Sequence, residues 1–306
     1  DALLSSPAVR HVRAWRDYVE LVKPRVTSLV LVTTAGGFWL GMRSGDSAGA
    51  LPLVLLGTAL AAGGANALNQ WSERAHDALM QRTKTRPLPS GRLSADAARR
   101  FGVVLAAAGS LLLASAVHWL PGALAAITIV TYVVLYTPMK RVTSLCTLVG
   151  AVPGALPPMI GWAAARHTLG LEAWTLFCIL FLWQLPHFLA IAVLFRDDYA
   201  RAGFRMLPVE DPGWVMTARH MVGYSLFLLP VSLIPAVIGM SGAVYFYGAL
   251  ILSTLYLAVS IDAARRRTLP AMRRLFRASL LYLPLLFGLL VGNKLPSPAI
   301  WAHTRV

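Results

Sequence analysis

Long apolar stretches recur along most of this sequence, and no other feature constrains its fold as strongly. Each is about 18 to 25 residues long, the length that an α-helix needs to cross roughly 30 Å of hydrocarbon. Inside lipid every backbone polar group must find a protein partner, and helices meet that need segment by segment. We therefore expect an all-α polytopic membrane protein with about nine transmembrane helices. The expected spans lie, within a few residues each, at 26–43, 51–71, 98–117, 119–137, 144–165, 171–194, 217–239, 243–262 and 275–293.

The charge of the chain indicates its orientation in the membrane rather than an affinity for nucleic acid. Only 13% of the residues are charged and 57% are hydrophobic, which leaves too little polar surface for a soluble domain of 306 residues. Positive residues collect on the cytoplasmic side of membrane proteins. With a cytoplasmic N-terminus, all but four of the 28 Lys and Arg residues fall in inside segments, the exceptions being Arg43, Arg166, Lys294 and Arg305. We expect an integral protein of a bacterial inner membrane, with its N-terminus inside, its C-terminus outside and no nucleic-acid partner.

One transmembrane domain accounts for nearly the whole chain, because no segment between spans exceeds roughly 30 residues and no repeat is visible. We expect a cytoplasmic tail at 1–16, a single domain at 17–293 and a short outer tail at 294–306. Cys146 and Cys178 each lie inside an apolar span, so neither a disulfide nor a thiolate metal site is supported.

A polar stripe runs along the end of the second span. Asn66, Asn69, Glu73 and Asp77 are spaced by three, four and four residues, which places them within roughly 80° of one helical face. Hard cations such as Mg²⁺ prefer oxygen ligands of this kind and often bind substrate phosphates as well. The stripe therefore predicts a Mg²⁺ site, although a solvated helix end with ordinary surface acids has the same pattern.

Positive residues follow this stripe directly. Arg82, Lys84 and Arg86 precede Pro87 and Pro89, which stop any helix. These cations can neutralise the acids in the absence of metal, hold a diphosphate that the metal also bridges, or anchor the loop to lipid headgroups. Four further cations are expected at the same cytoplasmic level, namely Lys23, Arg25, Lys140 and Arg141.

The sixth span carries a second group of polar residues. Gln184 and His187 lie in the span, and Asp197 and Asp198 follow at its cytoplasmic end. His187 and Asp198 are about three helical turns apart, so a continuous helix would place them on one face. We expect a polar track from the loop into the membrane, in which Asp197 or Asp198 faces the first stripe across a cavity. A lone histidine in a span can instead be bonded to a neighbouring helix.

The fifth span is interrupted. Residues 150–161 contain three prolines and three glycines, which must kink or break a helix. Freed backbone groups at membrane depth are tolerated only against protein or a cavity. This segment supports a central cavity that opens to the cytoplasmic side.

Taken together, these segments resemble the UbiA superfamily of intramembrane prenyltransferases, and within it the protohaem IX farnesyltransferases. The resemblance covers about residues 17–293. It rests on residues 23–27, the stripe from Asn69 to Asp77, and residues 82–89, 136–141, 150–162, 183–188 and 196–208. The last two segments are similar to the haem-modifying branch rather than to the branches that act on quinone rings.

The resemblance implies a Mg²⁺-dependent enzyme that transfers the farnesyl group of farnesyl diphosphate to a vinyl group of haem b, giving haem o. It implies catalytic roles for Asn69, Glu73, Asp77 and Asp198, and haem binding by His187. The same four and Asp197 become the metal ligands, and the diphosphate-binding residues become Arg82, Lys84, Arg86, Lys23, Arg25, Lys140 and Arg141.

The chain departs from the superfamily pattern at two places. Glu73 stands where an Asp is usual, which sets the charge one methylene further out. Asp197 and Asp198 are adjacent, whereas the superfamily's second motif spaces its two acids four residues apart. Either acid of this pair is therefore a candidate metal ligand.

Two other functions would also explain a polar cavity at one membrane face. The metal and diphosphate residues alone are equally compatible with prenylation of a quinone precursor or another aromatic acceptor. A transporter of an anionic substrate would also need cations and a broken helix, but it predicts access from both faces. The expected partners are the two substrates and the lipid bilayer, and the sequence leaves any protein partner open.

Overall fold

A computed structural model describes residues 15–296, so the predicted tails lie mostly outside the described residues. Within that range the regular elements are helices. The long helices are α2 (Pro24–Gly41), α3 (Leu51–Asp77), α4 (Ala95–Ala116), α5 (Trp119–Ile129), α7 (Cys146–Ala155), α8 (Pro157–Arg166), α9 (Leu171–Leu194), α12 (Val215–Val237), α13 (Ala243–Arg266) and α14 (Leu269–Gly292). The short ones are η2 (Ala48–Ala50), η3 (Val130–Tyr136), α6 (Thr137–Met139), α10 (Arg196–Arg201) and α11 (Leu207–Glu210).

The prediction of an all-α membrane protein is confirmed. Among the described residues, eight helical segments are long and apolar enough to cross a membrane. They correspond to the second to ninth expected spans. α2 is helical at the position of the first expected span, but it is not among those eight. The central cavity and the side on which it opens stay predictions.

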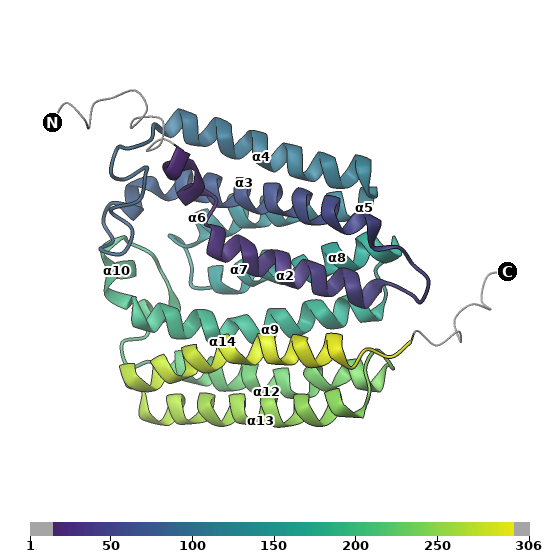
Figure 1. The fold of residues 1–306 in the computed structure, drawn as a ribbon. Helices are drawn as coiled ribbons and strands as arrows, with labels where there is room; N and C mark the ends of the chain where they lie inside the picture. Colours follow the sequence, from purple (N-terminus) through teal and green to yellow (C-terminus); the bar gives the residue numbers. More distant parts are fainter. Residues whose placement is uncertain (1–14, 297–306) are drawn as a thin grey trace, which may run out of the picture.

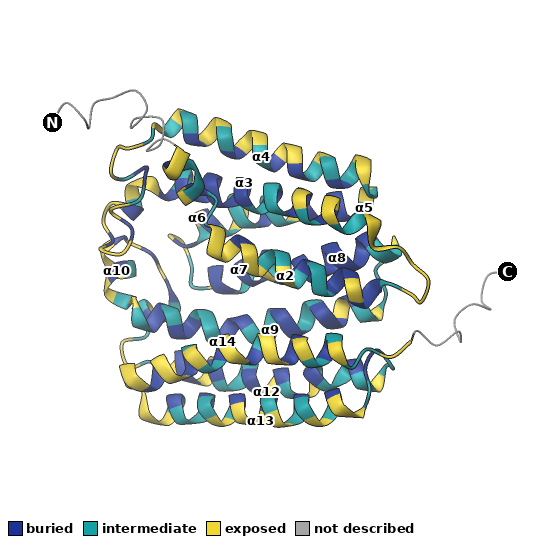
Figure 2. Ribbon diagram, in the orientation of Figure 1, coloured by how far each residue is buried: buried dark blue, intermediate teal, exposed yellow. Residues whose placement is uncertain are grey.

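The helices lie roughly along one common direction, with α7, α8 and α9 in the middle of the bundle (Figure 1). α3 packs on α4, α2 on α8, and α9 on α7, α12 and α14. Burial follows this order, because α8 and much of α9 are buried while α4 and α13 present exposed faces (Figure 2). Such exposed faces carry large apolar side chains, as expected of helices that contact lipid.

The crossing of α2 and α8 depends on two glycines. A methyl group at Gly161 would lie 1.9 Å from the carbonyl oxygen of Thr34, and one at Gly37 would lie 2.0 Å from that of Pro158. Both obstacles are backbone atoms and cannot rotate away. Small residues let membrane helices approach this closely.

We expect Gly161→Ala to destabilise the protein by several kcal/mol, because α2 and α8 would have to separate. The matched control is Gly223→Ala in α12, where a new methyl group meets no atom within 4 Å. That change should be neutral or stabilise by up to about 1 kcal/mol, since alanine favours helix more than glycine does. Thermal unfolding of both variants in the same detergent checks this, and equal melting temperatures would contradict it.

The predicted break in the fifth span is confirmed. α7 ends at Ala155 and α8 begins at Pro157. Pro157 and Pro158 have no backbone N–H, so carbonyl groups of the preceding turn lose their helical partners. The Gln184 amide, on α9, donates a hydrogen bond of 2.7 Å to the carbonyl oxygen of Ala151. A polar side chain from a neighbouring helix therefore supports the backbone just before the break.

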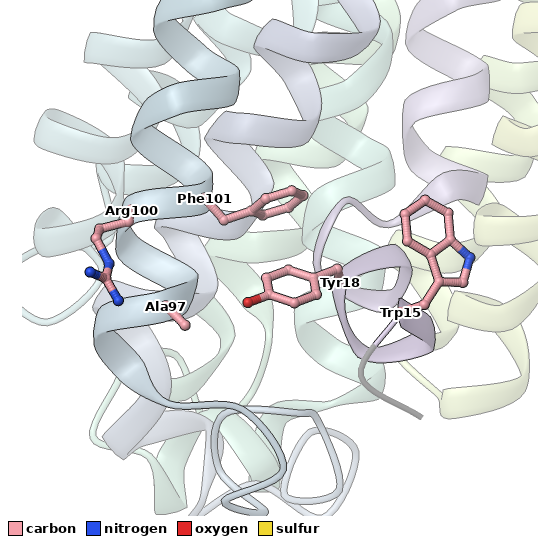
Figure 3. Close-up of a pocket in the computed structure, with 5 residues that line it drawn as sticks. All are labelled: Trp15, Tyr18, Ala97, Arg100 and Phe101. Atoms are coloured by element: carbon pink, nitrogen blue, oxygen red, sulfur yellow. The ribbon is translucent and has the colours of Figure 1, made fainter. Parts of the chain in front are cut away.

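A pocket of about 380 Å³ lies between the helical segment at 15–21 and the start of α4 (Figure 3). The rings of Tyr18 and Phe101 pack against each other with centroids 4.8 Å apart. Trp15, Ala97 and Arg100 complete the lining. The pocket contains no residue that the sequence predicts for the site.

Candidate functional site

The polar stripe of α3 lies at the end of the bundle where the loop between α3 and α4 and helix α10 also lie (Figure 1). Helix α3 stays helical through Asp77, so the stripe keeps its spacing. Asn69, Glu73 and Asp77 are only 2%, 4% and 1% exposed. The alternative of a solvated helix end is therefore wrong, because its side chains would face water.

Asn69 joins three segments of the chain. Its side-chain oxygen accepts from the Lys23 ammonium and from the Tyr132 hydroxyl, each at 3.4 Å. Its amide nitrogen donates to the Thr137 hydroxyl at 3.1 Å. The amide thus links α3 to the start of α2 and to the end of the fourth span.

Glu73 forms an ion pair with Lys140, which follows that fourth span. The ammonium nitrogen lies 2.7 Å from Oε1 and 4.5 Å from the centroid of the Tyr136 ring. Burial alone would lower the pKa of Lys140, but the charge of Glu73 raises that pKa well above its ordinary value. Lys140 is therefore a charged ammonium held beside the carboxylate.

Asp77 forms the second ion pair of the stripe. One guanidinium nitrogen of Arg86 lies 3.0 and 2.8 Å from the two carboxylate oxygens. The Thr83 hydroxyl donates to the backbone carbonyl of Asp77 at 2.8 Å, which folds the turn back onto the helix end. Arg86 is 22% exposed, so this pair lies at the border with solvent.

The structure distinguishes the two adjacent acids after α9. Asp198 is buried, and its carboxylate accepts from the backbone N–H groups of Gln81 and Arg82 at 3.0 and 3.4 Å, and from Arg201. Burial would raise the pKa of Asp198, but these donors hold it below the ordinary value. Asp197 is exposed. The buried acid therefore joins α10 to the turn after the α3 stripe.

The remaining predicted cations lie in different environments. The Arg82 guanidinium stacks over the Phe195 ring at 4.9 Å. Burial, together with the nearby cations of Arg86 and Lys140, lowers the pKa of Lys23 to about 7. A nearby anion would favour its charged form. The other predicted cations are exposed: Arg25, Lys84 and Arg141.

The expectation that His187 and Asp198 share one helical face is wrong. α9 ends at Leu194, and α10 starts after Phe195, whose backbone leaves the helical region. Gln184 bonds the backbone of α7, and Asp198 bonds the turn at 81–82. His187 contacts α14, where its Nδ1 lies 2.6 Å from the Ser279 hydroxyl. The polar residues of this segment therefore contact three different parts of the chain.

Two tyrosines lie at the stripe, because Tyr132 bonds Asn69 and the ring of Tyr136 faces Lys140. Tyr132 and Tyr136 belong to η3, a π-helical segment, and their rings stack with centroids 5.5 Å apart. π-Helical turns are rare and often occur at functional sites. Thr137 and Phe204, which touch Asn69 and Lys140, were missed because no local pattern distinguishes them from packing residues.

The side-chain oxygens at this end of the bundle could bind a divalent cation only if a diphosphate supplied further ligands. Oε1 of Glu73 is buried and makes no hydrogen bond of good geometry, although an ammonium lies beside it. Within residues 15–296, no three His, Cys, Asp or Glu side chains are grouped closely enough to hold a metal ion. Mg²⁺ needs only one or two carboxylates when phosphate oxygens and waters complete its shell. The residues therefore fit Mg²⁺ bound together with a diphosphate.

Comparison with known proteins gives strong matches over most of the chain. A model of the UbiA prenyltransferase family matches residues 30–291. A protoheme IX farnesyltransferase of Solibacter usitatus (strain Ellin6076) is 49% identical over 288 residues, which are 91% of this chain and 99% of the relative. One of Koribacter versatilis (strain Ellin345) is 43% identical over 293 residues, which are 91% of this chain and 93% of the relative.

Solved structures share the fold at low sequence identity. One structure has a TM-score of 0.78 at 14% identity and covers 91% of this chain and 98% of its own. It is described as giving insights into the biosynthesis of digeranylgeranylglyceryl phosphate synthase in membranes. A UbiA homologue from Archaeoglobus fulgidus, bound to GPP and Mg²⁺, has a TM-score of 0.62 at 17% identity, covering 90% and 99%. At these identities, both similarities show a shared fold and nothing further.

Proposed function

This chain belongs to the UbiA prenyltransferase family, and we propose that it transfers the farnesyl group of farnesyl diphosphate to a vinyl group of haem b. One observation carries the proposal. Buried Glu73 and Asp77 each meet a cation at one end of the bundle, in a chain 49% identical to a protoheme IX farnesyltransferase over 91% of its length. The products are haem o and diphosphate.

The reaction exchanges one carbon–oxygen bond for a carbon–carbon bond and a new alcohol. Diphosphate leaves with the electron pair of its bond to the farnesyl carbon. The terminal carbon of the vinyl group attacks that farnesyl carbon. The positive charge left on the neighbouring carbon is quenched by water, which contributes its oxygen and loses a proton. Farnesyl diphosphate, haem b and water thus become haem o, diphosphate and a proton.

The side chains of the stripe supply what the leaving diphosphate needs, because its developing charge must be neutralised. The cations of Lys140 and Arg86 form ion pairs with Glu73 and Asp77. We infer that both cations turn to the diphosphate when it binds. Lys23, whose pKa burial lowers to about 7, would become charged beside the diphosphate anion and add a third cation.

Mg²⁺ would be held by Asn69, Glu73 and Asp77, with Asp198 fixing the turn that carries Arg82. When bound, it supplies positive charge to the leaving diphosphate. The exposure of Asp197 favours Asp198 as the member of the pair that acts in the site. UbiA homologues bound to Mg²⁺ with GPP or DMAPP support this requirement.

The acceptor side needs a dry, electron-rich environment for an allylic cation. Stacked Tyr132 and Tyr136 lie next to Asn69 and Lys140, so their rings can shield the cation from water and stabilise its charge. His187 lies on α9 between aromatic rings, where neutral imidazole can bind haem iron. Both apolar substrates can enter from the bilayer.

We also infer the orientation in the membrane. The bias of Lys and Arg places the end that carries the stripe in the cytoplasm, with the N-terminus inside. The bacterial relatives support an inner-membrane location. Labelling of a single cysteine introduced at Ser90 tests the orientation. Reaction with an impermeant reagent added outside intact cells would contradict the inferred orientation.

The decisive experiment is to incubate the purified protein with haem b, farnesyl diphosphate and Mg²⁺ and to separate the haems by chromatography. We expect a new haem o peak, which is lost when a chelator removes Mg²⁺. A parallel incubation replaces haem b with a quinone precursor. Prenylation of the quinone precursor without haem o would contradict the proposal in favour of the aromatic-acceptor alternative. Transport of an anion is set aside by membership of a prenyltransferase family.

A further inference from the structure

His187 has an unusually well-defined environment for a histidine in a membrane span. Its ring stacks on Trp183 of the same helix and on Phe276 of α14, with centroids 5.3 and 5.2 Å away. Its Nδ1 lies 2.6 Å from Oγ of Ser279, also on α14. The indole N–H of Trp183 donates to the backbone oxygen of Ser279 at 2.9 Å. Two aromatic rings and one hydroxyl thus fix the plane of the imidazole.

The hydroxyl of Ser279 determines which ring nitrogen carries the proton. The hydroxyl has one hydrogen, and its oxygen lies 2.6 Å from the carbonyl oxygen of Phe276. A carbonyl oxygen can only accept, so the serine hydrogen points there. The contact with His187 then requires a proton on Nδ1. In neutral imidazole the other nitrogen, Nε2, must carry the free lone pair.

The second ring nitrogen, Nε2, makes no hydrogen bond within the described part of the chain, residues 15–296. The side chain is half-buried rather than enclosed. Ser279 itself is fully buried, so solvent does not compete for its hydroxyl.

We propose that Ser279 is a positioning residue, which holds His187 as the tautomer protonated on Nδ1 and so presents the bare Nε2 to the iron of haem b. This inference rests on the proposed function for the identity of the ligand. The tautomer itself follows from contacts of this chain alone. Histidine ligands of metals are commonly oriented by a hydrogen bond from the other ring nitrogen, and loss of that partner costs about 10- to 100-fold in affinity or activity.

The first test needs no variant. Nitrogen-15 NMR of the ligand-free protein in detergent, with labelled histidine, reports the protonation of each ring nitrogen. The chain has seven histidines, so the His187 signals are assigned by difference with His187→Gln. We expect a protonated Nδ1 and a bare Nε2, and the reverse would overturn the proposal.

The second test follows haem binding through its absorbance. Ser279→Ala should weaken haem b binding by about 10-fold or more and alter the Soret band, and the NMR signals should show the loss of the fixed tautomer. Ser279→Thr keeps a hydroxyl and should restore the spectrum. The matched control is Ser253→Ala on α13, which removes an equally buried hydroxyl that bonds Tyr282 at 2.9 Å. It should leave the haem spectrum unchanged.

The outcomes separate this inference from the function on which it rests. If the wild-type protein binds haem and a folded Ser279→Ala variant binds it equally well, Ser279 has no positioning role. If Ser279→Ala does not fold, the wild-type NMR result and the Ser279→Thr spectrum decide the question. If the wild-type protein binds no haem, the proposed function fails, and the ligand assigned to Nε2 fails with it.

Discussion

Asp77→Asn should lower haem o formation by about 100-fold or more while the protein stays folded. Asparagine keeps the volume of the side chain but removes the charge that holds Arg86 at 2.8 Å and that would bind Mg²⁺. Initial rates of haem o formation at saturating substrates, with Mg²⁺ varied, measure the loss. Near-normal turnover at saturating Mg²⁺ would remove Asp77 from the metal ligands.

A stability effect must be separated from this catalytic one, because removal of one partner from a buried ion pair can cost several kcal/mol. Arg86 is partly exposed and can be solvated when its partner is gone, which limits that cost. The melting temperature of Asp77→Asn should be measured beside that of Asp96→Asn. Asp96 lies in the first turn of α4, 79% exposed and 3.6 Å from Arg99. This control should change neither stability nor turnover.

Much of the fold could be predicted because the requirement for a membrane span is local. Length and apolarity located the helices of the bundle, and the prolines and glycines of residues 150–161 located the break between α7 and α8. The spacing of the α3 stripe was equally informative, since helical periodicity places Asn69, Glu73 and Asp77 on one face wherever the helix lies.

The partners of the stripe could not be predicted, because they depend on how distant segments pack. The pairing of Glu73 with Lys140 requires the fourth span to lie beside α3. The π-helical turns at Val130–Tyr136, which bring Tyr132 next to Asn69, have no signal in a run of apolar and aromatic residues. Nor does spacing reveal that the backbone leaves the helical region at Phe195 and separates His187 from Asp198.

The charges of the stripe are balanced by ion pairs within the chain. Two acids at the membrane border would repel each other if they were unpaired, but each is matched by a cation. A diphosphate arriving alone would meet the acids as well as the cations. Arrival together with Mg²⁺ lets the acids keep a positive partner while Lys140 and Arg86 move to the phosphate oxygens. We therefore infer that the diphosphate binds as its Mg²⁺ complex.

His187→Ala should weaken haem b binding by more than the roughly 10-fold expected for Ser279→Ala, because it removes the ligand rather than its support. Binding of farnesyl diphosphate should be almost unchanged, since the stripe of α3 makes its contacts with other helices. Haem absorbance and diphosphate binding are measured on the same preparation. His220→Ala serves as the control, because among the described residues that exposed histidine makes its one hydrogen bond to the carbonyl oxygen of Met216 in its own helix.

A structural histidine would give a different pattern. If the contact with Ser279 only ties α9 to α14, its loss should lower stability by about 1 to 3 kcal/mol and impair both ligands together. Selective loss of haem binding at an unchanged melting temperature therefore identifies a ligand, because a loosened helix pair cannot spare one substrate and affect the other. A stable His187→Ala protein with an unchanged haem spectrum and full activity would leave haem specificity to residues 196–208. The backbone N–H of Arg205 in this segment donates to the carbonyl oxygen of Lys140 at 2.7 Å, so the segment contacts the stripe's partner.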